Sequence, residues 1–252
     1  LGTISIVGNI SQYEAVDAFK GLIERWEVKD VEIPEYDIPY PNQSAKVYFV
    51  DVRNAKQSEI RIGYLGLPRT HPDFYATTIM NMKLGGNFSG DVNLILREEK
   101  GFTYGARTRF SGSRLPGTFT ASSGVRSNTT EESVNIFKNL MTAYRNPINE
   151  EDLKFTKNVT LKSNARQFET LGALRRMISN IATYDLPFDY IKNQEEIVRK
   201  MTIDSHNALV KKYIRPDEMI YLVVGDAATQ LNGMKSLGFG NPVLLDKEGN
   251  PL

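Results

Sequence analysis

The chain has 252 residues, 40% of them apolar, and carries 31 basic against 30 acidic side chains. This apolar fraction is enough for a core, so we expect a globular protein rather than a disordered one. The balanced charge argues against a nucleic-acid binder. The sequence contains no run of about 18 or more apolar residues, so it predicts no membrane-spanning helix. The sequence has no cysteine, which excludes disulfides, thiolate catalysis and cysteine-held metals.

The N-terminal part predicts one strand and one helix that are separated from the rest. Residues 3–8 (TISIVG) read as a strand, and the apolar spacing that follows, through Trp26, predicts a helix. Residues 29–45 contain three prolines and predict an extended linker. Because the chain opens without Met or a basic-then-apolar leader, we expect a mature product or a fragment. We therefore divide it into residues 1–28, the linker 29–45 and a main domain at 46–252.

The first half of the main domain is rich in strands. Alternating patterns predict strands at 46–52, 59–67, 102–110 and 117–125. Helices are expected at 71–86, stopped by two glycines, and at 92–100, stopped by Gly101 in a left-handed conformation.

The second half is rich in helices. The pattern predicts helices at 129–145 with a Thr129/Glu132 capping box, at 149–186 as one long helix or a kinked pair capped by Asn149, and at 202–214. The apolar run 218–227 predicts a buried central strand. This order of elements indicates an α+β fold. The segment 3–10 (TISIVGNI) also resembles 220–227 (IYLVVGDA), which favours a duplicated domain with the tail of another copy at the N-terminus.

Motifs for independent catalysis are absent from this sequence. Its two histidines, His71 and His206, stand 135 positions apart without the i, i+4 spacing of a helical zinc site, and we expect both to be solvated or capping. There is no G-x-S-x-G motif, and the Gly-rich stretch 84–90 (LGGNFSG) lacks the lysine of a phosphate loop and predicts a helix-to-helix turn. We therefore expect no metal site in this chain.

Arg97 and Tyr104 are the remaining candidates, and their segment 96–110 (LREEKGFTYGARTRF) allows two interpretations. In one, Arg97 is a cation at a helix C-terminus and Tyr104 is a half-buried packing residue on a strand. In the other, a glycine-stopped helix brings a guanidinium and a phenol to one rim, where they hydrogen-bond a peptide carbonyl or a developing oxyanion. The residue pattern alone leaves both open.

The same segment resembles the arginine–tyrosine segment in the second half of the pitrilysin/insulinase family of zinc peptidases, which includes the mitochondrial processing peptidases. The surrounding stretches match in order: 61–90, 117–125, 129–141, the helix that opens at 149, and 220–226. The opening 3–26 is similar to the end of the family's first domain. The resemblance departs at Gly90-Asp91-Val92, where many relatives have Ser-Arg-Leu, and the chain has no H-x-x-E-H motif.

The resemblance implies one half of a two-domain clamshell, built on a mainly antiparallel sheet with helices packed on one face. The other half, on the same polypeptide or on a second subunit, would carry the zinc. By position, Arg97 would bind a main-chain carbonyl of a peptide or unfolded polypeptide substrate, and Tyr104 would help stabilise the tetrahedral intermediate. We thus expect no peptidase activity and no stoichiometric zinc from this chain alone. Family analogy favours a bacterial periplasm or cell envelope.

Two other interpretations stay open at this stage. One is a scaffold or assembly subunit that kept the fold and lost catalysis, as core subunits of respiratory complexes resemble this family. The other is an unrelated α+β domain in which Arg97 ends a helix. The Arg97/Tyr104 pair favours the peptidase half, because a scaffold has no chemical reason to keep it.

Overall fold

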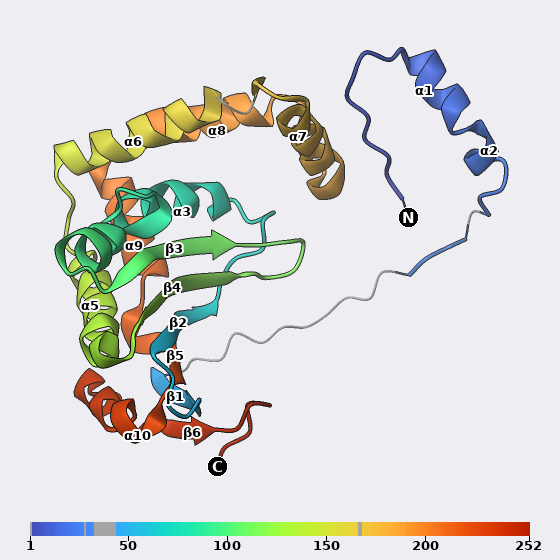
Figure 1. The fold of residues 1–252 in the computed structure, drawn as a ribbon. Helices are drawn as coiled ribbons and strands as arrows, with labels where there is room; N and C mark the ends of the chain where they lie inside the picture. Colours follow the sequence, from blue (N-terminus) through green and yellow to red (C-terminus); the bar gives the residue numbers. More distant parts are fainter. Residues whose placement is uncertain (1, 28, 33–43, 166–167) are drawn as a thin grey trace.

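The computed structural model describes residues 2–27, 29–32, 44–165 and 168–252. Most of the linker expected at 29–45 lies outside these residues. In the N-terminal part, α1 (Gln12–Ala18) and α2 (Lys20–Ile23) form where the apolar spacing predicts a helix. Residues 3–8 do not form the expected strand, and their isoleucines are exposed (Ile4 55%, Ile6 40%). A strand needs a sheet beside it, and Figure 1 shows this part lying apart from the sheet of the main domain.

The main domain is built on one six-stranded sheet (Figure 1). Its strands run in the spatial order β3-β4-β2-β5-β1-β6. The pairs β3–β4, β4–β2 and β2–β5 are antiparallel, whereas β5–β1 and β1–β6 are parallel. The strands are β1 (Lys46–Asp51), β2 (Gln57–Leu65), β3 (Thr103–Ser111), β4 (Thr118–Arg126), β5 (Ile220–Gly225) and β6 (Val243–Leu245). The expected α+β fold with a mainly antiparallel sheet is confirmed, and β5 is central as predicted.

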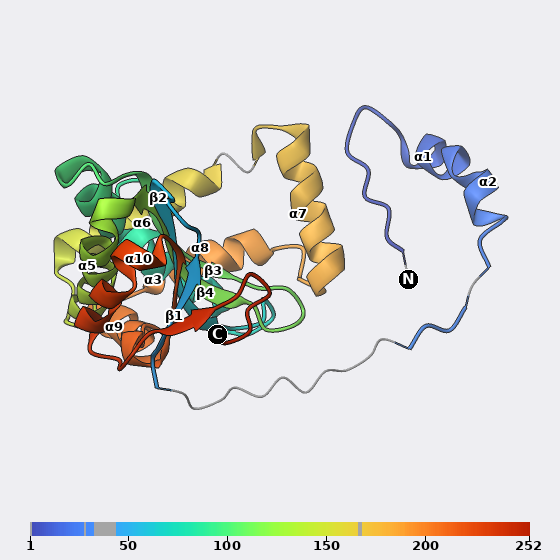
Figure 2. The ribbon, with the colours of Figure 1, turned by 60° about the horizontal axis from the view of Figure 1, so that its bottom comes forward.

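The longer helices lie on one side of this sheet, stacked over its face except for α7 (Leu171–Tyr184), which lies beyond the main body of the sheet (Figures 1 and 2). They are α3 (Phe74–Asn81), α5 (Thr130–Ala143), α6 (Glu150–Ala165), α7 (Leu171–Tyr184), α8 (Tyr190–Lys200) and α9 (Ile203–Tyr213). Two short helical segments lie between α3 and β3. The first is the π-helical turn η1 (Met82–Gly86), and the second is α4 (Asp91–Asn93), which continues into the π-helical turn η2 (Leu94–Glu99). Short helical segments complete the chain: η3 (Ser127–Thr129), η5 (Pro216–Glu218), α10 (Ala227–Gln230) and η6 (Asn232–Leu237).

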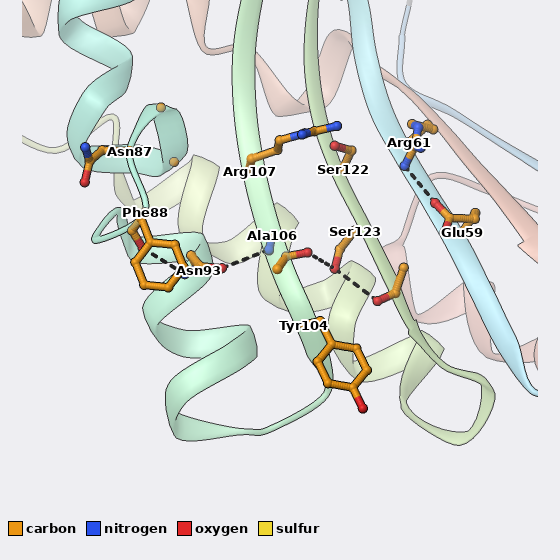
Figure 3. A pocket seen from close by; sticks show the side chains of 14 residues that line it. Glu59, Arg61, Asn87, Phe88, Asn93, Tyr104, Ala106, Arg107, Ser122 and Ser123 are labelled. Atoms are coloured by element: carbon orange, nitrogen blue, oxygen red, sulfur yellow. Dashed lines mark hydrogen bonds and ion pairs between the residues drawn. The ribbon is translucent and has the colours of Figure 1, made fainter. Parts of the chain in front are cut away.

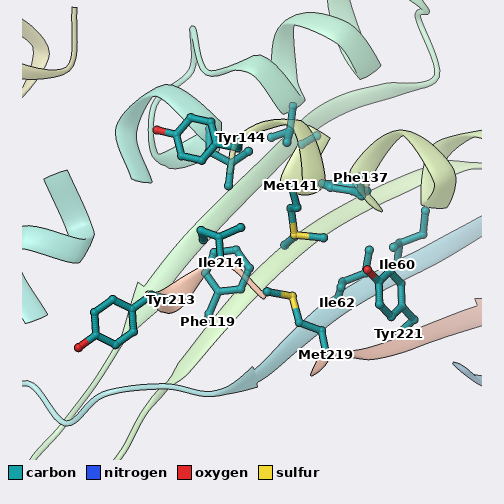
Figure 4. Packing of buried hydrophobic residues seen from close by; sticks show 14 of the residues in the cluster. Ile60, Ile62, Phe119, Phe137, Met141, Tyr144, Tyr213, Ile214, Met219 and Tyr221 are labelled. Carbon is teal, nitrogen blue, oxygen red and sulfur yellow. The ribbon is translucent and has the colours of Figure 1, made fainter. Parts of the chain in front are cut away.

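The core lies between the sheet and these helices. In β2, Ser58, Ile60 and Ile62 are buried and alternate with exposed residues, the pattern of a half-covered strand. Figure 4 shows Ile60 and Ile62 among side chains from β4, α5, β5 and the segment before β5. Each large apolar side chain buried here contributes about 1.5–3 kcal/mol to folding. On the opposite face of β2, β3 and β4 no helix of the described residues lies over the sheet, so polar residues stay accessible there.

Several local predictions can be compared with the structure. Gly101 adopts the expected left-handed conformation (φ 62°), and the side-chain oxygen of Asn149 accepts a hydrogen bond from the backbone N–H of Asp152 (2.8 Å). The capping box at Thr129 is wrong. A 3₁₀ turn precedes α5, and the Thr129 hydroxyl donates to the carbonyl of Arg126 (2.9 Å) instead of capping the helix. Helix α8 was not predicted, because its buried side chains (Tyr190, Ile191 and Val198) give only a sparse stripe.

Candidate functional site

The open face of the sheet forms one wall of a cleft of about 560 Å³ (Figure 3). Strands β2, β3 and β4 supply this wall, and the loop that follows η1 closes the cleft at the sheet edge formed by β3. The lining residues are Glu59, Arg61, Gly85, Gly86, Asn87, Phe88, Asn93, Tyr104, Gly105, Ala106, Arg107, Ser122, Ser123 and Gly124. Most of these side chains are polar, which suits a polar ligand such as a peptide backbone better than an apolar cofactor.

Glycines allow the loop to lie this close to the sheet. A Cβ atom on Gly85 would lie 2.5 Å from Cγ2 of Val92 and 2.9 Å from the backbone nitrogen of Thr108. A Cβ atom on Gly86 would lie 2.9 Å from the side-chain nitrogen of Asn81. The stretch that sequence reading assigned to a helix-to-helix turn is therefore also the part of the chain that abuts strand β3. Irregular π-helical turns on both sides of it are frequent beside functional sites.

Two asparagines bind the free edge of β3. The Asn81 amide nitrogen donates to the carbonyl of Thr108 (2.9 Å), and the Thr108 hydroxyl donates back to the Asn81 oxygen (2.7 Å). The Asn93 oxygen accepts from the backbone N–H of Ala106 (3.0 Å), while its nitrogen donates to the carbonyl of Phe88 (2.8 Å). These bonds satisfy edge groups that have no neighbouring strand and tie the loop to β3.

Tyr104 projects from an irregularity at the start of β3. The pairing register with β4 shifts between Thr103 and Ala106, so the residues between them leave the regular pleat. Hydroxyl groups hold this bulge: that of Thr103 donates to the Gly124 carbonyl (2.7 Å), and that of Ser123 donates to the Gly105 carbonyl (3.0 Å). The Tyr104 side chain is 94% exposed at the rim of the cleft (Figure 3). Of the two interpretations left open by the sequence, the one in which Tyr104 packs half-buried is therefore wrong.

Arg97 lies behind the loop rather than in the cleft lining. It stands in the last turn of η2, with its guanidinium carbon 4.6 Å from the centre of the Phe88 ring. Its Nη1 atom is buried and 3.3 Å from a carboxylate oxygen of Glu98, an ion pair that lacks the geometry of a hydrogen bond. Among the described residues, no hydrogen bond, ion pair or cation–π contact joins Arg97 to Tyr104; Phe88 lines the cleft and stacks on Arg97. Arg97 is thus a cation at the end of a helix, and it also has an N–H donor without a hydrogen-bond partner.

The cleft also contains arginines that the sequence reading did not single out. Arg61 on β2 and Arg107 on β3 both pair in register with Ser122 on β4. Arg61 donates to Glu59 on its own strand (2.9 Å). The signal was available, because strict alternation along 106–110 places Arg107 and Arg109 on the face opposite Ala106 and Phe110. The sequence could not predict the strand order, which places Arg61 level with Arg107 on the other side of Ser122.

The described residues offer no set of metal donors: they contain no group of three or more His, Asp or Glu side chains placed to hold an ion. His71 accepts a hydrogen bond at Nδ1 from the backbone N–H of Asp73 (3.0 Å), a local capping role. His206 is fully buried, so the expectation that it is solvated or capping is wrong. Its Nε2 lies 3.2 Å from the Tyr144 hydroxyl, which donates to the carbonyl of Met80 (2.6 Å). The donor groups of the described residues therefore do not fit a zinc ion.

The segment that departs from the family pattern begins a short helix here. Gly90 precedes α4, and Asp91 in its first turn forms an ion pair with Lys83 of η1. Lys83 is also 3.6 Å from a carboxylate oxygen of Asp152 on α6. One lysine thus links three elements. An arginine in place of Asp91 would put a second cation beside Lys83, whereas the Asp91 carboxylate forms an ion pair with it.

Among the described residues, no helix is long and apolar enough to span a membrane. A family model described as "Peptidase M16 inactive domain" matches residues 3–160. The "Uncharacterized zinc protease YmxG" of Bacillus subtilis is 23% identical over 232 residues, which cover 87% of this chain and 53% of that protein. The chain thus spans about half the length of this curated relative.

Two solved structures share the fold. The peptidase M16 inactive domain from Pseudomonas fluorescens is 20% identical with a TM-score of 0.75, over 87% of this chain and 52% of that one. A protease from Helicobacter pylori is 13% identical with a TM-score of 0.71, over 87% of this chain and 53% of that one. The family match covers more than half of the sequence and agrees with the resemblance read from its motifs. This protein belongs to the family of M16 peptidase inactive domains.

Proposed function

We propose that the chain is the non-metal half of a zinc peptidase and that Tyr104 and Arg97 act on a peptide bound in the cleft. The observation that carries this proposal is the 94% exposed Tyr104 side chain at the rim of a polar cleft, on a bulge held by Thr103 and Ser123. Because the Tyr104 ring and hydroxyl are exposed at the cleft, both are available to a bound peptide. A phenol O–H carried on a backbone that is held in place is a suitable donor to a peptide carbonyl oxygen and to the negative charge that develops on it.

Arg97 would contribute to substrate binding by donating a hydrogen bond. Its stacking on Phe88 supports one side of the loop, and its buried Nη1 has no hydrogen-bond acceptor among the described residues. A main-chain carbonyl of the substrate is an acceptor that would satisfy this donor. Because Arg97 lies outside the lining of the cleft, this contact requires Phe88 to move when the substrate binds. Phe88 is 65% exposed, so little packing opposes that movement.

The metal would belong to a zinc-bearing homologous domain or subunit. The chain has no donor set of its own for zinc within the described residues, and it covers only 53% of the zinc protease relative. The N-terminal segment 1–28 would be the tail of that preceding domain. Its described part exposes Ile4, Ile6, Ile23 and Trp26, which suits residues that pack against a sheet not contained in this chain.

The test is peptide cleavage by this chain, by the zinc-bearing half and by their mixture. The proposal predicts cleavage by the mixture alone, together with a loss of about a hundredfold in kcat for Tyr104→Phe, the usual effect of removing one donor to a developing oxyanion. Arg97→Ala is expected to lower kcat/KM at least tenfold. Tyr184→Phe, which keeps the ring that stacks with Arg69, is the matched control and should leave cleavage unchanged. A stable complex that cleaves nothing, or cleaves equally well in all variants, would instead support a scaffold subunit.

A further inference from the structure

The cleft carries a row of arginine side chains beside Tyr104. Arg61, Ser122 and Arg107 are register partners on three neighbouring strands and share the open face of the sheet. With strands about 4.8 Å apart, the two arginines stand about 10 Å from each other across the small Ser122 side chain. In Figure 3 the Arg107 side chain extends across β4 toward Ser122, and Arg61 lies on the far side.

The charge of this row is not balanced within the cleft. Glu59 is the one carboxylate in the lining, and Arg61 already uses it in an ion pair of 2.9 Å. Arg107 is exposed and has no ion-pair or hydrogen-bond partner for its guanidinium among the described residues. Arg109, two residues further on the same face, likewise lacks an acidic partner there. The cleft therefore presents an unpaired, planar, always-charged donor next to the proposed substrate contact.

We propose that the row selects peptides by a carboxylate, which binds over Ser122 to Arg107 with Arg61 on its other side. The proposal rests on the proposed function in one respect, namely that the cleft holds a peptide. A carboxylate matches the fork of a guanidinium with two parallel hydrogen bonds, and the Ser122 hydroxyl can supply another donor. A lysine or arginine of the peptide at the same place would meet two like charges and be disfavoured.

The carboxylate has two possible sources, an internal Asp or Glu side chain or the free C-terminus of the peptide. Both are tested with one peptide series in which a single Glu is moved along the sequence and compared with Gln, each with a free and with an amidated C-terminus. Binding to this chain is measured by fluorescence anisotropy, and cleavage is measured with the zinc-bearing half added. The variants are Arg107→Gln and Arg61→Gln. Arg175→Gln, at an exposed position on α7, is the matched control.

For an ion pair at an open cleft we expect about a fivefold preference for the carboxylate, weaker at high salt. The preference should fall to about one in Arg107→Gln, fall in part in Arg61→Gln and persist in Arg175→Gln. Arg107→Glu should reverse it in favour of a Lys peptide. Loss of the preference on amidation assigns the C-terminus as the source, and loss on Glu→Gln assigns the side chain.

The outcomes separate this inference from the proposed function. A carboxylate preference in binding that depends on Arg107, without any cleavage, supports the inference and contradicts the peptidase role. Cleavage that depends on Tyr104 but is indifferent to peptide charge and to Arg107 supports the peptidase role and overturns the inference. If neither binding nor cleavage distinguishes Glu from Gln or free from amidated peptides, the inference is wrong.

Discussion

Asn93 and Ala106 are joined by a hydrogen bond of 3.0 Å, in which the backbone N–H of Ala106 donates to the side-chain oxygen of Asn93. The same asparagine donates to the carbonyl of Phe88 at 2.8 Å. A single side chain therefore connects the loop that closes the cleft with the strand that carries Tyr104. Ala106 follows Tyr104 by two positions and is the residue at which regular pairing resumes, so this bond fixes the end of the bulge from which Tyr104 projects.

Replacing Asn93 by Ala should weaken both the fold and the site. The change leaves a buried N–H and a carbonyl without partners, which costs about 1–3 kcal/mol in the free energy of unfolding. Urea unfolding measures this cost, and NMR shifts of the Gly105 and Ala106 amides report on the bulge. Asn135→Ala is the control, since Asn135 also makes two side-chain hydrogen bonds but is only half-buried, and both of its bonds lie in exposed surroundings. An Asn93→Ala protein that is as stable as Asn135→Ala would show that the connection is unimportant.

Two glycines that line the cleft should differ in how well they tolerate a methyl group. In Gly85→Ala the new Cβ would lie within 3 Å of Val92 and of Thr108, so the loop must move away from β3. We expect a loss of about 1–3 kcal/mol in the free energy of unfolding. In Gly105→Ala the nearest atom, on Asn93, is 3.9 Å away, an ordinary contact. Thermal unfolding of the two variants side by side checks this, and equal stability would contradict the close approach of the loop.

The buried pair of Tyr144 and His206 predicts a dependence of stability on pH. Burial is the main influence that lowers the pKa of His206; Asn207, the Met80 carbonyl and Asp152 act in the opposite direction. The unfolded chain therefore binds the proton more readily than the folded one. The contribution of His206 is fully present above the unfolded pKa of about 6.5 and is lost as pH falls toward its folded pKa.

Urea unfolding at pH values from 8 down to 5 should show this loss, and His206→Gln should reduce it. His71→Gln is the control because His71 lies at the surface end of α3 and outside the buried pair. Asp73 does not interfere: hydrogen bonds from Lys212 and Tyr213 lower its pKa, so its contribution is lost only below about pH 3.8. The same pH dependence in wild type and His206→Gln would contradict the assignment.

The sequence predicts those parts of the structure that depend on local patterns. The alternation in β2, the left-handed Gly101 and the Asn149 cap each follow from a few neighbouring residues. The run 218–227 was correctly placed in the centre of the sheet because no other segment is as continuously apolar. Periodicity is informative here, since one side of the sheet is covered and the other is not.

Other features depend on contacts between distant segments. Residues 129–132 have the sequence of a capping box, yet the Thr129 hydroxyl bonds to the carbonyl of Arg126 in a 3₁₀ turn. Sequence spacing does not distinguish a capping box from such a turn. Strand parity placed Tyr104 with the packed side chains, but the register shift between Thr103 and Ala106 turns it outward. His206 was expected at the surface because it stands in the first turn of a helix, whereas α9 carries it against Tyr144. The pairing of Arg61 with Arg107 through Ser122 required the strand order.

The most direct test of the account is the value of kcat for a mixture of this chain with the zinc-bearing half, compared between wild type, Tyr104→Phe and Tyr184→Phe. The exposed phenol at the cleft predicts that Tyr104→Phe loses about a hundredfold in kcat while remaining folded and bound to the other half. Tyr184→Phe should match wild type. Equal cleavage by all three proteins would contradict the account, because Tyr104 would then have no chemical role at this site.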